Sequence, residues 1–164
     1  MITLREFRPD DAPALRAVFE SAIHGVAIRD YTQAQVDAWA PREHDAADWA
    51  EHMKDLAPFV ALVEGAIAGY ADLQPSGYID HFFVSAAAGG QGVGGALMRR
   101  ILARAGELGL AELTSHVSLT AQPFYAHFGF EIVEQRVEEI NGVELRNAAM
   151  RKTLAGWPPE EDSP

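Results

Sequence analysis

The strongest constraint on the fold lies between residues 59 and 84. Three short segments there, 59–64, 67–73 and 78–84, follow the two-residue period of strands and are separated by turn residues. Gly65 marks the first turn, and Pro75-Ser76-Gly77 marks the second. Strands joined by turns this short pair antiparallel, because parallel pairing needs a long crossover. The segments therefore predict an antiparallel meander and disfavour a doubly wound parallel sheet.

Patterns on both sides of the meander predict a fold of the α/β (α+β) class. Thr32 with Gln35 has the spacing of a helix capping box, and Asn141-Gly142 is typical of a tight hairpin turn. The expected architecture is a mixed, mostly antiparallel sheet of six to seven strands flanked by about four to five helices. Further strands are predicted at residues 2–7, 113–117, 130–137 and 145–154, and helices at about 12–26, 32–39, 45–56, 93–108 and 120–128.

Length and charge narrow the class of protein. The 164 residues suit one domain, which we expect over residues 1–154, followed by an acidic, proline-rich tail at 155–164. With 24 acidic against 13 basic residues, the formal net charge is −11, which disfavours nucleic acid and anionic membranes as partners. The sequence has no cysteine and no apolar run long enough to span a membrane. We therefore expect a cytoplasmic protein.

A glycine-rich stretch at residues 89–95 (GGQGVGG) follows the meander and opens the next helix. Glycines let backbone N–H groups approach an anion closely, and a helix start adds a favourable dipole. A flexible turn explains the glycines as well, so both interpretations stay open. Gly90, Gly92 and Gly95 fit a dinucleotide fingerprint, but the preceding strands are antiparallel and no acidic residue follows at the required distance. A nucleoside triphosphate loop is disfavoured because its lysine is missing.

Two motifs resemble those of the GNAT family of N-acetyltransferases. Residues 82–84 and 89–98 resemble the acyl-CoA loop and helix, and residues 121–130 (AQPFYAHFGF) are similar to the second signature, an Ala, then a Tyr, then Gly-Phe. The order of predicted elements over residues 2–154 also matches the family's acyl-CoA N-acyltransferase fold. Gly89 departs from the Gln or Arg that the family often has there. The resemblance therefore implies weaker binding of the pyrophosphate at this position, but not its loss.

The resemblance implies that acetyl-CoA is the cosubstrate and that an amine attacks its thioester directly. The loop would bind the pyrophosphate, the edge of the strand ending at Val84 would pair with the pantetheine arm, and main-chain groups could polarise the thioester oxygen. The expected cofactor-binding residues are Phe83, Val84, Gly89, Gly90, Gln91, Gly92, Val93, Gly94, Gly95, Ala121, Phe124 and Tyr125.

Three residues are candidates for catalysis. The resemblance makes Tyr125 the acid, because a phenol is protonated at neutral pH and can donate its proton to the leaving thiolate. Asp80 and His81 are candidates for the base that deprotonates the amine. They would point to opposite faces of one strand, so only one can face a given cleft. We favour Asp80 over His81, and a water chain that uses neither remains an alternative.

The acceptor is expected to be a small-molecule amine or an exposed lysine or N-terminus. The acidic chain hints at a cationic acceptor. His24 and Tyr31, together with Asp80, are the candidates for contacting it. Asp45, Asp48 and His52 have helical spacing that could hold a metal, but a solvated helix face explains them too, and no metal site is expected. Dimers occur in the family, so a homodimer is compatible with the resemblance.

Two other functions compete with acetyl transfer. One is a non-catalytic acyl-CoA-binding regulatory domain, which Tyr125 argues against. The other is a nicotinamide-dependent oxidoreductase, which the antiparallel meander and the missing ribose-binding acid disfavour.

Overall fold

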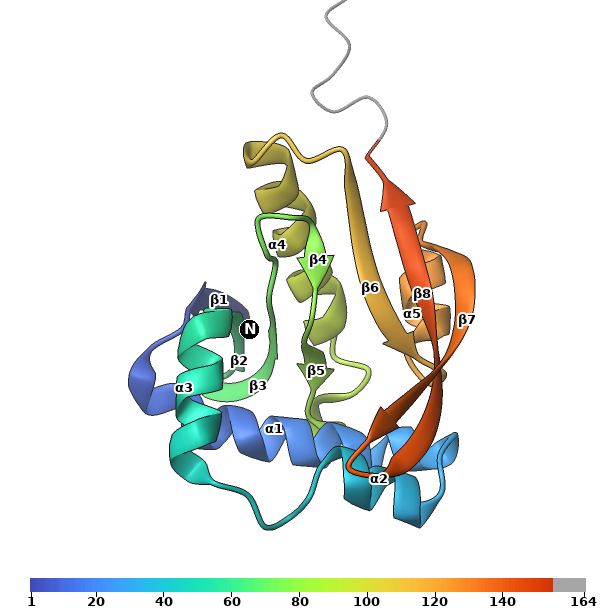
Figure 1. Ribbon diagram of the computed structural model, residues 1–164. Coiled ribbons are helices and arrows are strands. Elements are labelled where there is room, and N and C mark those ends of the chain that lie inside the picture. Colours follow the sequence, from blue (N-terminus) through green and yellow to red (C-terminus); the bar gives the residue numbers. More distant parts are fainter. Residues whose placement is uncertain (155–164) are drawn as a thin grey trace, which may run out of the picture.

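The strands form two four-stranded sheets and not the single sheet of six to seven strands that was expected (Figure 1). The computed structural model describes residues 1–154, so the predicted tail at 155–164 lies outside the described residues. The first sheet has the order β1-β2-β3-β5 and the second β4-β6-β8-β7. All pairs are antiparallel except β4 with β6. The strands are β1 (Ile2–Glu6), β2 (Phe59–Val63), β3 (Ala66–Ala71), β4 (Tyr78–Ile79), β5 (Phe82–Val84), β6 (Glu112–Ser118), β7 (Glu131–Ile140) and β8 (Val143–Thr153).

Helices cover both faces of the first sheet. Neighbouring residues of β2 point to opposite faces: Val60 joins the core formed with α1, α2 and α3, and Ala61 joins the core formed with α4. Tyr70 and Ala71 of β3 divide in the same way. The helices are α1 (Ala12–Gly25), α2 (Gln33–Trp39), α3 (Ala46–Leu56), α4 (Val93–Glu107) and α5 (Gln122–His127), with 3-10 turns η1 (Pro9–Asp11), η2 (Ala27–Arg29) and η3 (Ala86–Ala88).

Local sequence signals explain where the helices begin. The predicted capping box is present at α2, where Thr32 Oγ1 accepts the N–H of Gln35 and the Gln35 side chain accepts the N–H of Thr32. Asp45 caps α3 by accepting the N–H of Asp48. None of the helices within residues 1–154 is long and apolar enough to cross a membrane.

The prediction of one continuous strand over residues 78–84 is wrong. The chain leaves the second sheet after β4 and enters the first sheet at β5, so Asp80 and His81 lie between the two strands (Figure 1). Their N–H groups have no ladder partner at this point and instead donate to the Asp72 carboxylate, at 2.9 and 2.8 Å. A buried carboxylate thus satisfies the backbone where the two sheets separate.

Candidate active site

Two cavities meet where the sheets separate. The larger cavity has a volume of about 540 Å³ and the smaller cavity about 240 Å³. They share six lining residues, so they adjoin along one wall. A chamber of the larger size accommodates a small organic molecule. The shared residues are Trp39, Phe82, Phe83, Ser118, Ala121 and Tyr125.

The smaller cavity is largely apolar and lies between the end of α1, η2, β5, α5 and the start of α4. Of the residues expected to bind the cofactor, it is lined by Phe83, Val84, Gly94, Ala121, Phe124 and Tyr125. Gly94 allows a close approach, because a Cβ there would lie 3.2 Å from Cε2 of Phe124. Thr120 adds a buried hydroxyl oxygen that has no hydrogen-bond partner within the described residues. This oxygen could bond a polar group of a guest molecule.

The glycine loop leads from η3 into the first turn of α4. Gly92 caps the helix with a φ of +88°, a backbone conformation that favours glycine. The first bond of the helix runs from the N–H of Ala96 to the carbonyl of Gly92, at 3.0 Å. The three preceding N–H groups, of Val93, Gly94 and Gly95, therefore have no acceptor inside the helix and can face an anion. Val93 is buried in the core and can contribute its backbone only.

Tyr125 lines both cavities and is 3% exposed. Its ring packs against Phe82 and Phe130, with centroids 5.8 and 4.9 Å away. Burial raises the pKa of the phenol far above its usual value. Tyr125 is therefore protonated at neutral pH, as an acid requires.

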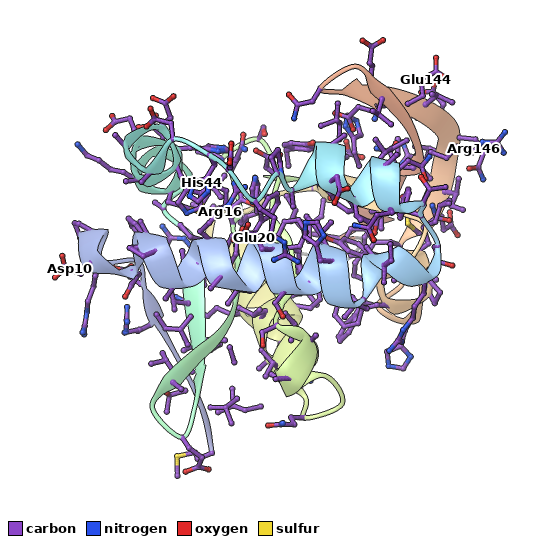
Figure 2. All side chains as sticks on the ribbon, turned by 90° about the horizontal axis from the view of Figure 1, so that it is seen from below. Asp10, Arg16, Glu20, His44, Glu144 and Arg146 are labelled. Atoms are coloured by element: carbon purple, nitrogen blue, oxygen red, sulfur yellow. The ribbon has the colours of Figure 1, made fainter. Side chains whose placement is uncertain are left out.

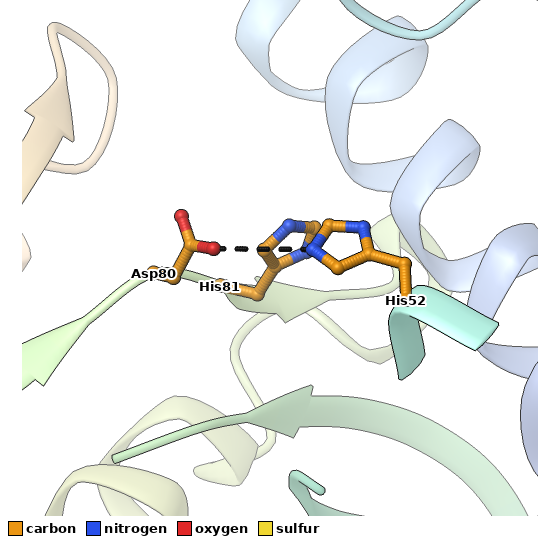
Figure 3. Close-up of side chains that lie close together, drawn as sticks. All are labelled: His52, Asp80 and His81. Carbon is orange, nitrogen blue, oxygen red and sulfur yellow. Dashed lines mark ion pairs between the residues drawn. The ribbon is translucent and has the colours of Figure 1, made fainter. Parts of the chain in front are cut away.

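Asp80, His81 and His52 gather on the wall of the larger cavity (Figure 3). His52 comes from α3, and its Nε2 lies 4.0 Å from Oδ2 of Asp80. Burial raises the pKa of the Asp80 carboxyl, while the nearby His52 opposes the shift. The two side chains remain 38% (Asp80) and 48% (His52) exposed, so both can reach a molecule in the cavity.

A hydrogen bond to Tyr70 holds the imidazole ring of His81 in place. The Tyr70 hydroxyl and Nδ1 of His81 are 3.0 Å apart and hydrogen bonded, and Tyr70 is fully buried. Burial, and secondarily the neighbouring His52, lowers the pKa of His81 to about 3. The imidazole is therefore neutral at physiological pH and is a much weaker base than an ordinary histidine.

Asp72, which orders the backbone beside these residues, should make stability depend on pH. Burial raises its pKa to about 6, above its value in the unfolded chain. Folding therefore favours the protonated form, and this contribution to stability is present below about pH 4 and lost as the pH rises through 6.

The variant Asp72→Asn tests this assignment. Its amide oxygen can still accept both N–H bonds, and it carries no charge. We expect its free energy of unfolding, relative to wild type, to increase by about 3 kcal/mol from about pH 4 to pH 7, for a shift of about two pKa units. Urea unfolding across this pH range measures the difference. If the free energy of unfolding has the same pH dependence in wild type and Asp72→Asn, the assignment of a raised pKa to the buried Asp72 is contradicted.

The two candidates for acceptor contacts in the first helical region differ in position. Tyr31 lines the larger cavity, but its hydroxyl donates to the carbonyl of Arg146 and accepts the N–H of Leu119. His24 lines neither cavity. Its Nε2 is bonded to the carbonyl of Ala40, at 2.7 Å. The structure thus places the Tyr31 ring in the site and leaves His24 outside it.

Other polar and charged side chains also line the larger cavity, and sequence reasoning had not assigned them to it. Glu138 of β7 brings a second carboxylate, and Tyr78 and His116 are hydrogen bonded to each other on its wall. Arg16 belongs to α1 and lies near His44 (Figure 2), with its guanidinium over the rings of Phe19 and of Trp49 from α3. Asp45 and Asp48 do not join His52 in a ligand set among the described residues.

Comparisons with known proteins agree with this geometry. The sequence model described as acetyltransferase (GNAT) domain matches residues 27–154. The Escherichia coli K12 protein YafP, described as an uncharacterized N-acetyltransferase, is 31% identical over 150 residues, which are 92% of this chain and 95% of YafP.

Solved structures lead to the same conclusion. A GCN5-related N-acetyltransferase from Rhodopseudomonas palustris superimposes with a TM-score of 0.88 at 31% identity, over 93% of this chain and 95% of that chain. The Salmonella typhimurium protein yncA, solved with its cofactor acetyl-CoA, has a TM-score of 0.68 at 19% identity, over 100% of this chain and 98% of that one.

The chain belongs to the GNAT family of acetyltransferases. It is an acyltransferase that uses acetyl-CoA as its cosubstrate, which favours the enzyme over the regulatory and oxidoreductase alternatives. The resemblance to the family and the expected fold class are confirmed.

Proposed function

We propose that the protein transfers the acetyl group of acetyl-CoA to a primary amine of a small, cationic molecule bound in the larger cavity. The observation that carries the proposal is the meeting of the two cavities at Tyr125. The smaller, apolar cavity suits the pantetheine arm, and the larger one suits the acceptor. The thioester would then lie at their shared wall, beside a protonated phenol.

The loop and the first turn of α4 bind the pyrophosphate in this proposal. The N–H groups of Val93, Gly94 and Gly95 have no acceptor inside the helix, and the positive end of the helix dipole favours the phosphates. Gly89, Gly90, Gln91 and Gly92 supply the preceding backbone. Thr120 offers its buried hydroxyl to an amide of the pantetheine arm.

The reaction uses two groups of the chain. Asp80 takes a proton from the ammonium, directly or through one water, and the free amine attacks the thioester carbonyl carbon. As the tetrahedral intermediate collapses, the carbon–sulfur bond breaks and Tyr125 donates its proton to the departing thiolate. The nitrogen gives up its second proton, which returns to the Tyr125 phenolate directly or through water, and Asp80 releases its proton to solvent, so the products are the amide and CoA thiol. His81 is the weaker candidate for the base because its pKa is lowered to about 3.

The lining charges support a cationic acceptor. Asp80, Glu138 and Glu43 bring carboxylates to the larger cavity, although Arg16 and Arg146 also line it. Arg16 is 8% exposed and donates to the carbonyl of Pro41, so its charge is partly engaged by the protein. An acceptor with two separated amino groups could place one near Asp80 and the other near Glu43 or Glu138.

Release of CoA thiol from acetyl-CoA tests the proposed function. The panel would contain diamines and polyamines, aminoglycosides, lysine derivatives, and anionic amines such as glutamate. The chain has no cysteine, so a thiol reagent reports on CoA alone. We expect at least a tenfold preference for one cationic acceptor. A preference for an anionic amine would contradict the acceptor class, and the lack of release with every amine would contradict the small-molecule acceptor.

The glycine loop is tested by Gly92→Ala with Gly65→Ala as its matched control. Both residues have positive φ, +88° and +81°, so both variants should lose a similar stability of about 1–2 kcal/mol. Gly65 lies in the β2–β3 turn, outside both cavities. By calorimetry we expect the Kd for CoA to rise at least tenfold for Gly92→Ala and less than twofold for Gly65→Ala. Equal affinities would contradict binding by this loop.

A further inference from the structure

Three side chains on the wall of the larger cavity have the chemistry of metal ligands. One donor atom each from His52, Asp80 and His81 lies within 4.8 Å of the other two (Figure 3). We propose that these residues bind one divalent transition-metal ion, with Zn²⁺ as the reference ion, and that the bound ion inhibits the enzyme reversibly by occupying the place of the acceptor amine. The metal site stands on its own geometry, and only the inhibition rests on the proposed function.

The ligand set suits such an ion. Two imidazoles and one carboxylate are ligands that Zn²⁺, Co²⁺ and Ni²⁺ accept, whereas Mg²⁺ and Ca²⁺ prefer oxygen alone. Ligand atoms at about 2.1 Å from a tetrahedral ion lie about 3.4 Å apart. The His52–Asp80 distance of 4.0 Å is therefore close to the required spacing. Small rotations of the half-exposed His52 and Asp80 side chains would bring their ligand atoms to the required spacing.

One ligand side chain, His81, is already oriented, and the backbone that carries both His81 and Asp80 is ordered. The bond between Nδ1 of His81 and the Tyr70 hydroxyl leaves Nε2 as the nitrogen available to an ion. Such a partner orients a ligating imidazole and raises the affinity of the site. The Asp72 carboxylate accepts the N–H groups of both Asp80 and His81 and so orders the backbone that carries them.

The third ligand comes from a separate element that is itself anchored. His52 lies on α3, one turn after Trp49, whose indole N–H donates to the carbonyl of Ala12 in α1 at 2.8 Å. The imidazole ring of His52 stands edge-on to that of His81, with the two ring centroids 5.1 Å apart. The site therefore joins α3 to the β4–β5 junction across the cavity.

The location of the cluster gives the ion its effect on activity. All three residues line the larger cavity, so the remaining coordination positions face its interior. An ion there would hold the Asp80 carboxylate, which the proposed reaction uses to deprotonate the acceptor. Inhibition should be competitive with the amine, and the affinity for acetyl-CoA should be unchanged.

Binding is measured first, without any substrate. The full chain, freed of metal by a chelator, is titrated with Zn²⁺ by calorimetry and with Co²⁺ by visible absorption. We expect one ion per chain and cobalt bands typical of four or five ligands. His52→Ala should weaken binding at least tenfold. His127→Ala, which removes an exposed histidine at the end of α5, should bind as wild type does.

Two further variants keep the result interpretable. Asp80→Ala removes a second ligand, and Tyr70→Phe removes only the hydroxyl that orients His81, which should weaken binding about 10- to 100-fold. Circular dichroism and thermal unfolding identify any variant that fails to fold. Equal binding by wild type and His52→Ala, or a loss with His127→Ala, would overturn the site.

Activity forms a separate arm of the test. We expect Zn²⁺ to raise the KM for the amine and a chelator to reverse the effect. Binding of Zn²⁺ by this cluster without amine-dependent thiol release would leave the metal site intact and contradict the proposed function. If the protein binds no Zn²⁺ and its amine-dependent turnover is unchanged by Zn²⁺, the metal site is contradicted and the proposed function is not.

Discussion

Tyr125→Phe is expected to lower kcat at least about 100-fold while the Kd for CoA stays within about twofold of wild type. The ring continues to pack against Phe82 and Phe130, and only the hydroxyl is lost. Without it, the thiolate must leave with no proton donor. The buried phenol in the wild type keeps its proton because burial raises its pKa. Steady-state kinetics with calorimetry on the same preparation measure both quantities.

Tyr78→Phe provides the matched control for this prediction. Tyr78 also lines the larger cavity, but it is absent from the wall shared with the smaller cavity. Its hydroxyl is bonded to Nδ1 of His116, at 3.4 Å. We expect its kcat to change less than about threefold. Equal losses in the two variants, or a parallel loss of kcat and CoA affinity in Tyr125→Phe, would contradict the role of Tyr125 as the acid.

Asp80→Asn should have the second large effect, a fall in kcat/KM of about 100-fold or more at neutral pH. The variant retains the size of the side chain but cannot accept the proton of the ammonium. Its rate should then rise with pH until the free amine predominates in solution, because the solvent takes over the deprotonation. The measurement is made with a chelator present, so that metal binding does not contribute.

His81→Gln is the comparison for Asp80→Asn. With a pKa lowered to about 3, His81 is a poor base, and its bond to Tyr70 serves to position the ring. We expect the fold-decrease in kcat/KM for His81→Gln to be less than one tenth of the fold-decrease for Asp80→Asn. The opposite ranking would make His81 the base, and small losses in both variants would favour a water chain.

Much of the fold and part of the site could be predicted because the signals are local in sequence. The cap at Thr32, the positive φ of Gly92 and the hairpin turn at Asn141 follow from residue type and short spacing. The cofactor side of the site depends on two contiguous motifs, around Gly92 and Tyr125. Each motif contributes residues to the lining of the smaller cavity, Gly94 from the first and Ala121, Phe124 and Tyr125 from the second.

On the acceptor side, Asp80, His81 and Tyr31 were predicted and line the larger cavity, but the rest could not be predicted because it depends on contacts between distant segments. The break between β4 and β5 requires the Asp72 carboxylate, eight and nine residues before the N–H groups it accepts. A two-residue period cannot reveal such a break, so the argument that Asp80 and His81 point to opposite faces failed. His52 and Glu138 reach the same cavity from α3 and β7, and nothing near either residue indicates it.

A crystal structure of the acetyl-CoA complex tests the central claim most directly. The account predicts the pyrophosphate at the N–H groups of Val93, Gly94 and Gly95, the pantetheine arm in the smaller cavity, and the sulfur within hydrogen-bond reach of the Tyr125 hydroxyl. The acetyl carbonyl carbon should open into the larger cavity, toward Asp80. An acetyl group buried away from Tyr125, or a cofactor bound outside the smaller cavity, would contradict it.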